Sequence, residues 1–232
     1  MPITLEVLAD AAALARRASD EVAAAAASAI GHRGSFAVAV SGGSTPRLML
    51  EHLAARDDIE WDRVTIFQVD ERVAPEGHPD RNLVMLEDAL TSKVAVAVQP
   101  MPVDADDLDL AAGGYAAALE MTAGSPPVLD LVQLGLGEDG HTASLAPDDP
   151  VLDFVDRDVA LTRSYRGQVR MTLTRPVLDR ARQRLWLVSG MAKADAFSRL
   201  LIGDISIPAT LISTDRSLVL ADRSAATGGN WS

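Results

Sequence analysis

The residues best suited to chemistry stand together in one glycine-rich segment, LGLGEDGHTASL, at positions 134–145. Its three glycines leave the backbone free to turn sharply after the apolar run that precedes them. Beside the glycines stand Glu138, Asp139 and His141, two carboxylates next to an imidazole. This combination is typical of a proton-transfer site. An exposed polar loop with a surface histidine is the alternative, and the glycines and paired carboxylates argue against it.

A second candidate is the segment 41–46, SGGSTP, which supplies Ser41, Gly42, Gly43, Ser44 and Thr45. At the start of a helix it offers backbone N–H groups and hydroxyls to a phosphate. It lacks the lysine of a P-loop and the spacing of a dinucleotide fingerprint, which excludes ATP and NAD. Ser44 is assigned to phosphate rather than to nucleophilic attack, because no Gly-x-Ser-x-Gly elbow surrounds it. A glycine turn that only starts a helix is the alternative.

Charged residues in three further segments are candidates for the same anion site: Asp70, Arg72, Arg170 and Lys193. The Arg72 guanidinium suits a phosphate in bidentate geometry, and an internal ion pair with Glu71 is the alternative. Lys193 follows Ser-Gly at the start of a predicted helix, where the helix dipole does not favour a cation. An anionic ligand explains that lysine better than helix stability does, although a solvated surface lysine remains the alternative. Arg170 is interpreted in the same way.

The elements that must position these segments alternate along the chain. Hydrophobic periodicity and turn residues predict helices at 8–30, 47–55, 82–90, up to about 121, from 175 and at 191–201. Strands are predicted at 36–40, 64–69, 94–98, 128–134, 169–173 and 184–189, with an edge strand at 217–220. Alternation of this kind predicts an α/β fold: one domain over 1–232, with a mostly parallel Rossmann-like sheet and helices on both faces. The carboxyl ends of its strands then meet at one ligand-binding edge.

Composition limits the function classes. The chain has 232 residues, 48% of them apolar, and no cysteine, which excludes thiol catalysis, disulfides and cysteine-based zinc sites. Its net charge of −12 disfavours nucleic acid and anionic membranes as partners. No secretory signal is apparent, so the cytoplasm is the expected location. An anionic ligand therefore needs a local cluster of cations.

Five motifs in order resemble the 6-phosphogluconolactonase family of the pentose phosphate pathway. They are SGGSTP at 41–46, DER at 70–72 followed by Asn82, GLGEDGHTASL at 135–145, RMTLT at 170–174 and GMAKA at 190–194. The resemblance implies hydrolysis of 6-phospho-D-glucono-1,5-lactone to 6-phospho-D-gluconate without metal or organic cofactor. It implies His141 as general base, oriented by Asp139 or Glu138. Arg72, Lys193 and the 41–45 segment then hold the phosphate. A small phosphosugar lactone is the only partner implied, and a monomer is favoured.

Two alternatives come from other classes. The glucosamine-6-phosphate deaminases are similar through Asp-Gly-His, but their ring-opening glutamate falls here on Ala146, which transfers no proton. A non-catalytic phosphosugar-binding or regulatory module is the other alternative, and no segment resembles an attached DNA-binding domain. The chain departs from the lactonase pattern at Arg81, usually serine, and at 164–168, where SYRGQ replaces a proline-rich approach to Arg170. Arg166 in that segment and Arg81 are left without a role.

Overall fold

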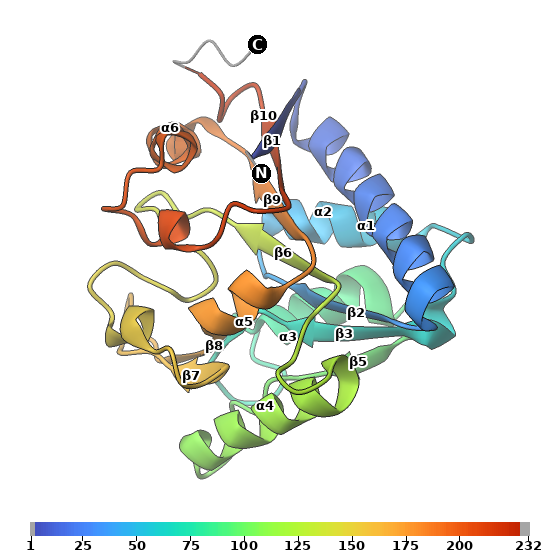
Figure 1. Cartoon of the computed structure of the whole chain (residues 1–232), viewed down its shortest axis with the longest axis vertical. Coiled ribbons are helices and arrows are strands. Elements are labelled where there is room, and N and C mark those ends of the chain that lie inside the picture. The colour runs from blue at the N-terminus through green and yellow to red at the C-terminus, as the bar shows by residue number, and fades with distance from the viewer. Residues whose placement is uncertain (1–2, 228–232) are drawn as a thin grey trace.

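The computed structural model describes residues 3–227 (Figure 1). Its strands are β1 (Thr4–Leu8), β2 (Phe36–Val40), β3 (Val64–Gln68), β4 (Asp70–Arg72), β5 (Ala97–Gln99), β6 (Leu131–Gly135), β7 (Val159–Leu161), β8 (Arg170–Leu173), β9 (Arg184–Val188) and β10 (Ser217–Asp222). Its α-helices are α1 (Ala11–Arg33), α2 (Ser44–Ala54), α3 (Asn82–Leu86), α4 (Leu108–Ala123), α5 (Arg175–Arg180) and α6 (Ala194–Ile202). A π-helical turn, Glu87–Thr91, continues α3, and a 3₁₀ turn, Met191–Lys193, leads into α6.

A seven-stranded sheet forms the centre of the described region, in the order β1-β10-β9-β6-β2-β3-β5. Every neighbouring pair in it is parallel. In Figure 1 these strands follow one another from β1 at the top to β5 at the bottom. The mostly parallel α/β sheet predicted from the sequence is therefore confirmed.

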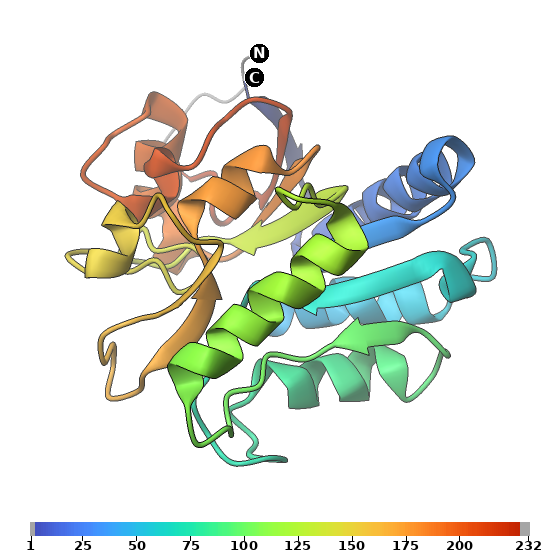
Figure 2. The same ribbon diagram turned by 60° about the horizontal axis from the view of Figure 1, so that its bottom comes forward.

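Side chains on the central strands alternate between two apolar layers, as the pleat requires. In β2, Phe36, Val38 and Val40 pack into one layer, together with apolar residues of α1, α2 and α3. Ala37 and Ala39 face the other layer, which contains residues of α4, α5 and α6. Figure 2 shows α4, in green, lying across that second face. Helices thus cover both faces, and the strand ends remain available for a site.

The structure of the N-terminal region contradicts two predictions made from the sequence, the start of the first helix and the position of the edge strand. The predicted helix 8–30 begins too early, because Thr4–Leu8 forms strand β1 and the helix starts after Asp10, whose side chain accepts the Ala13 N–H at 2.8 Å. The predicted edge strand 217–220 is also wrong. Strand β10 is paired on both sides and fully buried, and β1 occupies the edge.

A second sheet, of order β4-β8-β7, is antiparallel and was not expected from the sequence. Residues 70–72, which follow the predicted strand 64–69, form its strand β4, and the predicted strand at 169–173 joins this sheet as β8 instead of the central one. Each of these strands has three or four residues, too few for a clear hydrophobic period. The small sheet places charged residues beside the carboxyl ends of the central strands.

Candidate active site

A cavity of about 250 Å³ opens where β2, β3, β6 and β9 end. Most residues predicted for the site line it: Ser41, Gly42, Gly43, Ser44, Thr45, Asp70, Arg72, His141, Arg170 and Lys193. Asp139 lies behind His141, outside the lining, and Glu138 is exposed to solvent. The charged lining consists of three cations and one carboxylate in addition to His141. This strongly acidic chain therefore carries a local positive site.

A hydrogen-bonded series of side chains ends at the cavity. The Nδ1 atom of His141 lies 2.6 Å from Oδ1 of Asp139, and the hydroxyl of Tyr165 donates to Oδ2 of the same carboxylate at 2.5 Å. With Nδ1 engaged, Nε2 is the ring nitrogen left for a ligand. Asp139, and not Glu138, is the carboxylate that contacts the imidazole. The sequence left these two residues as alternatives.

The ionisation of Asp139 is fixed by the same contacts. Partial burial opposes its charge, but the hydrogen bonds from Tyr165 and His141 outweigh burial and lower its pKa to about 2. Asp139 is therefore an anion at neutral pH. An anionic partner favours the Nδ1–H tautomer of His141 and stabilises an imidazolium when one forms.

Two glycines of the segment 134–145 are required by close contacts. A Cβ at Gly137 would overlap the His141 ring, and its N–H donates to the His141 carbonyl at 2.7 Å. Gly140 has φ +82°, and a Cβ there would overlap Ile207. The Gly140 carbonyl also accepts the N–H of Ala209 at 2.9 Å. The loop that presents His141 is thus held from two sides.

The segment 41–45 forms the entrance to α2. Ser41 is buried and its hydroxyl donates to the Gln133 carbonyl at 3.0 Å, so this hydroxyl is committed to β6. Gly43, at φ +121°, is the N-cap and provides no side-chain acceptor for the first turn of the helix. The N–H groups of Ser44 and Thr45 consequently face the cavity end of the helix without intrahelical acceptors. This is the geometry of an anion site at a helix N-terminus.

Arg72 points to the cavity and is held from behind. Its Nη1 donates to the Asp80 carbonyl at 2.5 Å and to Oδ1 of Asn82 at 3.0 Å. Glu71 accepts the backbone N–H of Arg72 at 2.8 Å, and its carboxylate lies 3.7 Å from Arg81. The internal ion pair considered from the sequence therefore forms with Arg81, while the guanidinium of Arg72 stays at the site.

Glu71 is fully buried and organises this part of the site. Its carboxylate accepts the N–H groups of Asn82 and Leu83 at 2.7 and 2.8 Å, and the side-chain amide of Gln68 at 2.8 Å. These bonds satisfy the start of α3 and fix Asn82. The Asn82 amide lies directly against Gly42, where a Cβ would overlap it. These contacts connect the carboxyl end of strand β2 with the carboxyl end of strand β3.

Asp70 and Arg170 form the remaining wall. The Asp70 carboxylate accepts the Ser144 hydroxyl at 2.5 Å and the Asn82 amide at 3.2 Å, and it lies 3.9 Å from Arg170. Arg170 stands directly across from Arg72 in the β4–β8 pair. Burial lowers the pKa of Arg170 from its usual range, and its Nε has no hydrogen-bond partner within residues 3–227. The Arg170 guanidinium therefore has unused donor capacity next to the cavity.

Comparison with known proteins identifies the family. A family model described as glucosamine-6-phosphate isomerases/6-phosphogluconolactonase matches residues 9–220. The chain belongs to this family. Two relatives named 6-phosphogluconolactonase are each 36% identical to it: that of Synechocystis sp., over 85% of this chain and 86% of the relative, and that of Mycobacterium tuberculosis, over 97% and 98%.

Solved structures support the fold. The 6-phosphogluconolactonase from Trypanosoma cruzi superposes with a TM-score of 0.87 over 99% of this chain and 98% of its own. Its sequence identity is 22%, so the likeness concerns the fold alone. The confirmed family membership agrees with the resemblance seen in the five motifs.

The description of the isomerase/lactonase family covers two kinds of reaction, so residues of the site are needed to distinguish between them. Ala146 occupies the position at which the deaminases are expected to carry a glutamate, and it is buried against the core next to Leu145. A buried methyl group transfers no proton.

Within residues 3–227, no group of three or more His, Asp or Glu side chains is placed to hold a metal ion. In the same region, no helix is both long and apolar enough to cross a membrane.

Three residues at this family site were not assigned a role from the sequence: Asn82, Ser144 and Tyr165. Asn82 and Ser144 stand inside the quoted motifs, which was a usable signal. Tyr165 stands in the segment that departs from the family pattern, and no local pattern links it to Asp139, which is 26 positions away. Of the two arginines left without a role, Arg81 is buried in the ion pair with Glu71, and Arg166 is exposed outside the cavity lining.

Proposed function

We propose that this chain, acting as one catalytic unit, hydrolyses 6-phospho-D-glucono-1,5-lactone to 6-phospho-D-gluconate. The observation that carries the proposal is the Asp139–His141 pair at 2.6 Å beside a cavity with three cationic side chains. The names of the relatives at 36% identity support the same reaction. A lactone carbonyl is electrophilic, so water needs a base and a stabilised oxyanion but no covalent intermediate.

In this mechanism His141 is the general base. Its Nε2 accepts a proton from a water molecule while the water oxygen bonds to the lactone carbonyl carbon, which gives a tetrahedral oxyanion and an imidazolium. The ionised Asp139 stabilises that imidazolium. When the intermediate collapses, the bond to the ring oxygen breaks and the imidazolium returns its proton to that oxygen. The products are the free hydroxyl and a carboxylic acid, which ionises at neutral pH.

The phosphate is held away from the carbonyl. The helix α2 N-terminus, Arg72 and Lys193 offer charge-assisted donors to a phosphate, and Arg170 lines the same cavity. Binding energy from this remote group positions the lactone against His141. We assign Asp70 to holding Arg170 and Asn82, because its carboxylate oxygens already accept protein donors and would repel a phosphate.

A proton-release assay with freshly generated lactone, corrected for spontaneous hydrolysis, tests the proposal. The wild type should accelerate hydrolysis, and His141→Asn should lose about a hundred- to ten-thousandfold of that rate while still binding phosphogluconate. Glucosamine 6-phosphate should release no ammonia. An unaltered rate in His141→Asn would remove His141 as the base, and ammonia release would favour the deaminase alternative.

A further inference from the structure

Within the segment 164–168, Tyr165 is the residue that contacts both members of the Asp139–His141 pair. Its hydroxyl donates to Oδ2 of Asp139 at 2.5 Å. Its ring meets the His141 ring edge-on, with centroids 5.6 Å apart and planes at 62°. Tyr165 itself is not part of the cavity lining. It therefore acts on the pair from behind, without touching the space that a substrate would occupy.

A tight hairpin holds Tyr165 in this place. The backbone of Tyr165 and Gln168 exchanges two hydrogen bonds, at 3.0 and 3.2 Å. Between them, Arg166 and Gly167 have φ of +53° and +83°, as a two-residue type I′ turn requires. Below the turn, Thr162 and Arg170 are linked by backbone and hydroxyl bonds at 2.9 and 3.1 Å. The hairpin is thus an ordered extension of the β7–β8 pair.

Charged groups surround the phenol on several sides. The guanidinium carbons of Arg166 and Arg170 lie 5.2 and 5.5 Å from the centroid of the Tyr165 ring. Asp139 faces the hydroxyl, and His141 faces the ring edge. Across the cavity the other charged lining residues are Asp70, Arg72 and Lys193. The two cations are attracted to the electron-rich face of the ring and so hold the ring in place.

We propose that Tyr165 is a positioning residue for the general base: its hydroxyl and the Nδ1–H of His141 divide the two oxygens of Asp139 and so fix the orientation of the imidazole. This inference rests on the proposed function. With Oδ1 taken by His141 and Oδ2 taken by Tyr165, the carboxylate has one orientation in which both bonds form. The imidazole then keeps its Nδ1–H tautomer and presents Nε2 to the cavity.

The hydroxyl also sets how strongly Asp139 attracts a proton on His141. The bond from Tyr165 stabilises the carboxylate charge and is one cause of the lowered pKa of Asp139. Without that bond, more of the carboxylate charge is available to the imidazolium. Loss of the hydroxyl should therefore shift the acid limb of the pH–rate profile upward.

The test compares the steady-state kinetics of Tyr165→Phe and the wild type over a range of lactone concentrations and pH. We expect kcat to fall by about tenfold, the order of one hydrogen bond to a charged group, with KM within about twofold. The acid limb of kcat/KM should move to higher pH. The matched control is Tyr115→Phe, because Tyr115 is the other tyrosine of the chain and its buried hydroxyl bonds to the backbone of Gln68, at 2.8 and 3.0 Å.

Tyr115→Phe should lower the unfolding temperature and leave the pH profile unchanged. If Tyr165→Phe keeps the wild-type kcat and pH profile, or if its activity falls only with thermal stability as in the control, the positioning role is overturned. A second measurement needs no substrate. The ¹⁵N shifts of the His141 imidazole, assigned with His141→Asn, should report the Nδ1–H tautomer in the wild type and change in Tyr165→Phe. Should the wild type fail to hydrolyse the lactone, the proposed function fails, and these shifts still decide the role of Tyr165.

Discussion

Arg72 and Arg170 stand directly opposite each other across the antiparallel strands β4 and β8. Like charges directly opposite each other in a strand pair destabilise a sheet. The structure keeps both in place through Asp80 and Asn82 on one side and Asp70 on the other. An anion bound between them would relieve the repulsion. The pair therefore lowers the stability of the small sheet, and a bound phosphate would offset that loss.

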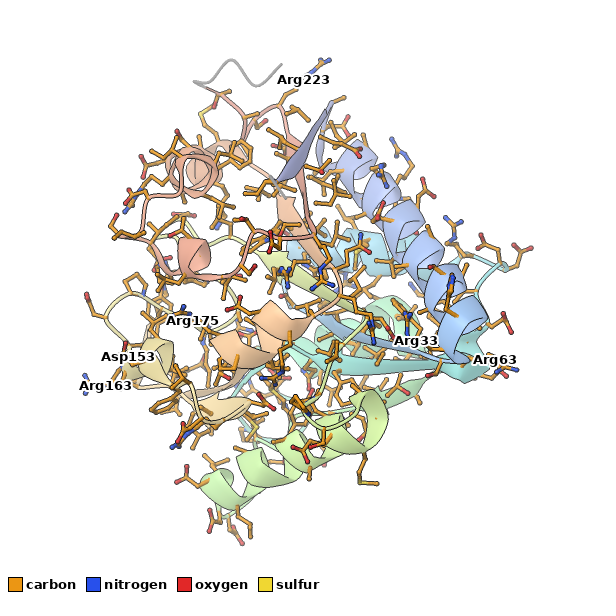
Figure 3. All side chains as sticks on the ribbon, in the orientation of Figure 1. Arg33, Arg63, Asp153, Arg163, Arg175 and Arg223 are labelled. Atoms are coloured by element: carbon orange, nitrogen blue, oxygen red, sulfur yellow. The ribbon has the colours of Figure 1, made fainter. Side chains whose placement is uncertain are left out.

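The first prediction is that phosphogluconate stabilises the folded protein through this pair. A ligand at a hundred times its Kd adds about 2.7 kcal/mol to the free energy of unfolding. The rise in unfolding temperature should be largely lost in Arg170→Gln. Arg163→Gln is the control, because Arg163 is exposed at the periphery (Figure 3). An equal rise in both variants, measured by thermal denaturation, would contradict the proposed phosphate contact.

The second prediction separates phosphate binding from carbonyl chemistry. Arg72→Ala and Lys193→Ala should each lower kcat/KM for the phosphorylated lactone by roughly ten- to a hundredfold, because each removes a charge-assisted contact of about 1.5–3 kcal/mol. Unphosphorylated gluconolactone never makes these contacts, so it should be a poor substrate whose turnover barely changes. If both lactones suffer equally, the two residues serve the fold or the carbonyl instead.

The third prediction distinguishes the two carboxylates beside His141. Asp139→Asn should reduce kcat by about a hundred- to ten-thousandfold, because an amide neither stabilises the imidazolium nor fixes its tautomer. Glu138→Gln changes an exposed side chain outside the cavity and should stay within about twofold of the wild type. Steady-state kinetics of the two variants decide the matter. The reverse ranking would return Glu138 to the role that the sequence left open.

The fourth prediction concerns acid pH. The pKa of Asp139 is lowered from 3.8 to about 2, so its contribution to stability is complete above 3.8 and is lost as pH falls through about 2. The stability difference between wild type and Asp139→Asn should therefore shrink from pH 4 to pH 2. Loss of kcat/KM between pH 8 and 5 must come from another group, and histidine is the ordinary candidate. A flat activity profile over that range would exclude His141 as the base.

Much of the fold could be predicted because long apolar runs with regular spacing determine it. The central strands and helices α2, α4 and α6 follow from that periodicity and from glycine and proline boundaries. Strand β1 was missed because Leu8 and the alanine-rich stretch after it together show the pattern of one continuous helix. The small sheet was missed because its pairing joins β4 to β8, about a hundred residues later in the chain, and no local pattern records such a contact.

The site was predictable where chemistry is concentrated in one segment. The segments 41–45 and 138–141 and the arginines of β4 and β8 could be named from residue types and their place after strands. The supporting contacts could not be named, because they join different segments: Ser144 to Asp70, and Tyr165 to Asp139. Nor could the sequence separate Glu138 from Asp139, because residue type alone does not show which of two adjacent carboxylates contacts the His141 ring.

The order of the central strands has a consequence for how the chain assembles as it is synthesised. Among the described residues, strand β1 pairs with β10 and with no other strand of the central sheet, and β10 is the described strand furthest along the chain from β1. Residues 4–8 must therefore wait, unpaired, until residues 217–222 have emerged. The sheet edge nearest the start of the chain is completed last, and a translation product that stops short of β10 leaves β1 without a place to fold.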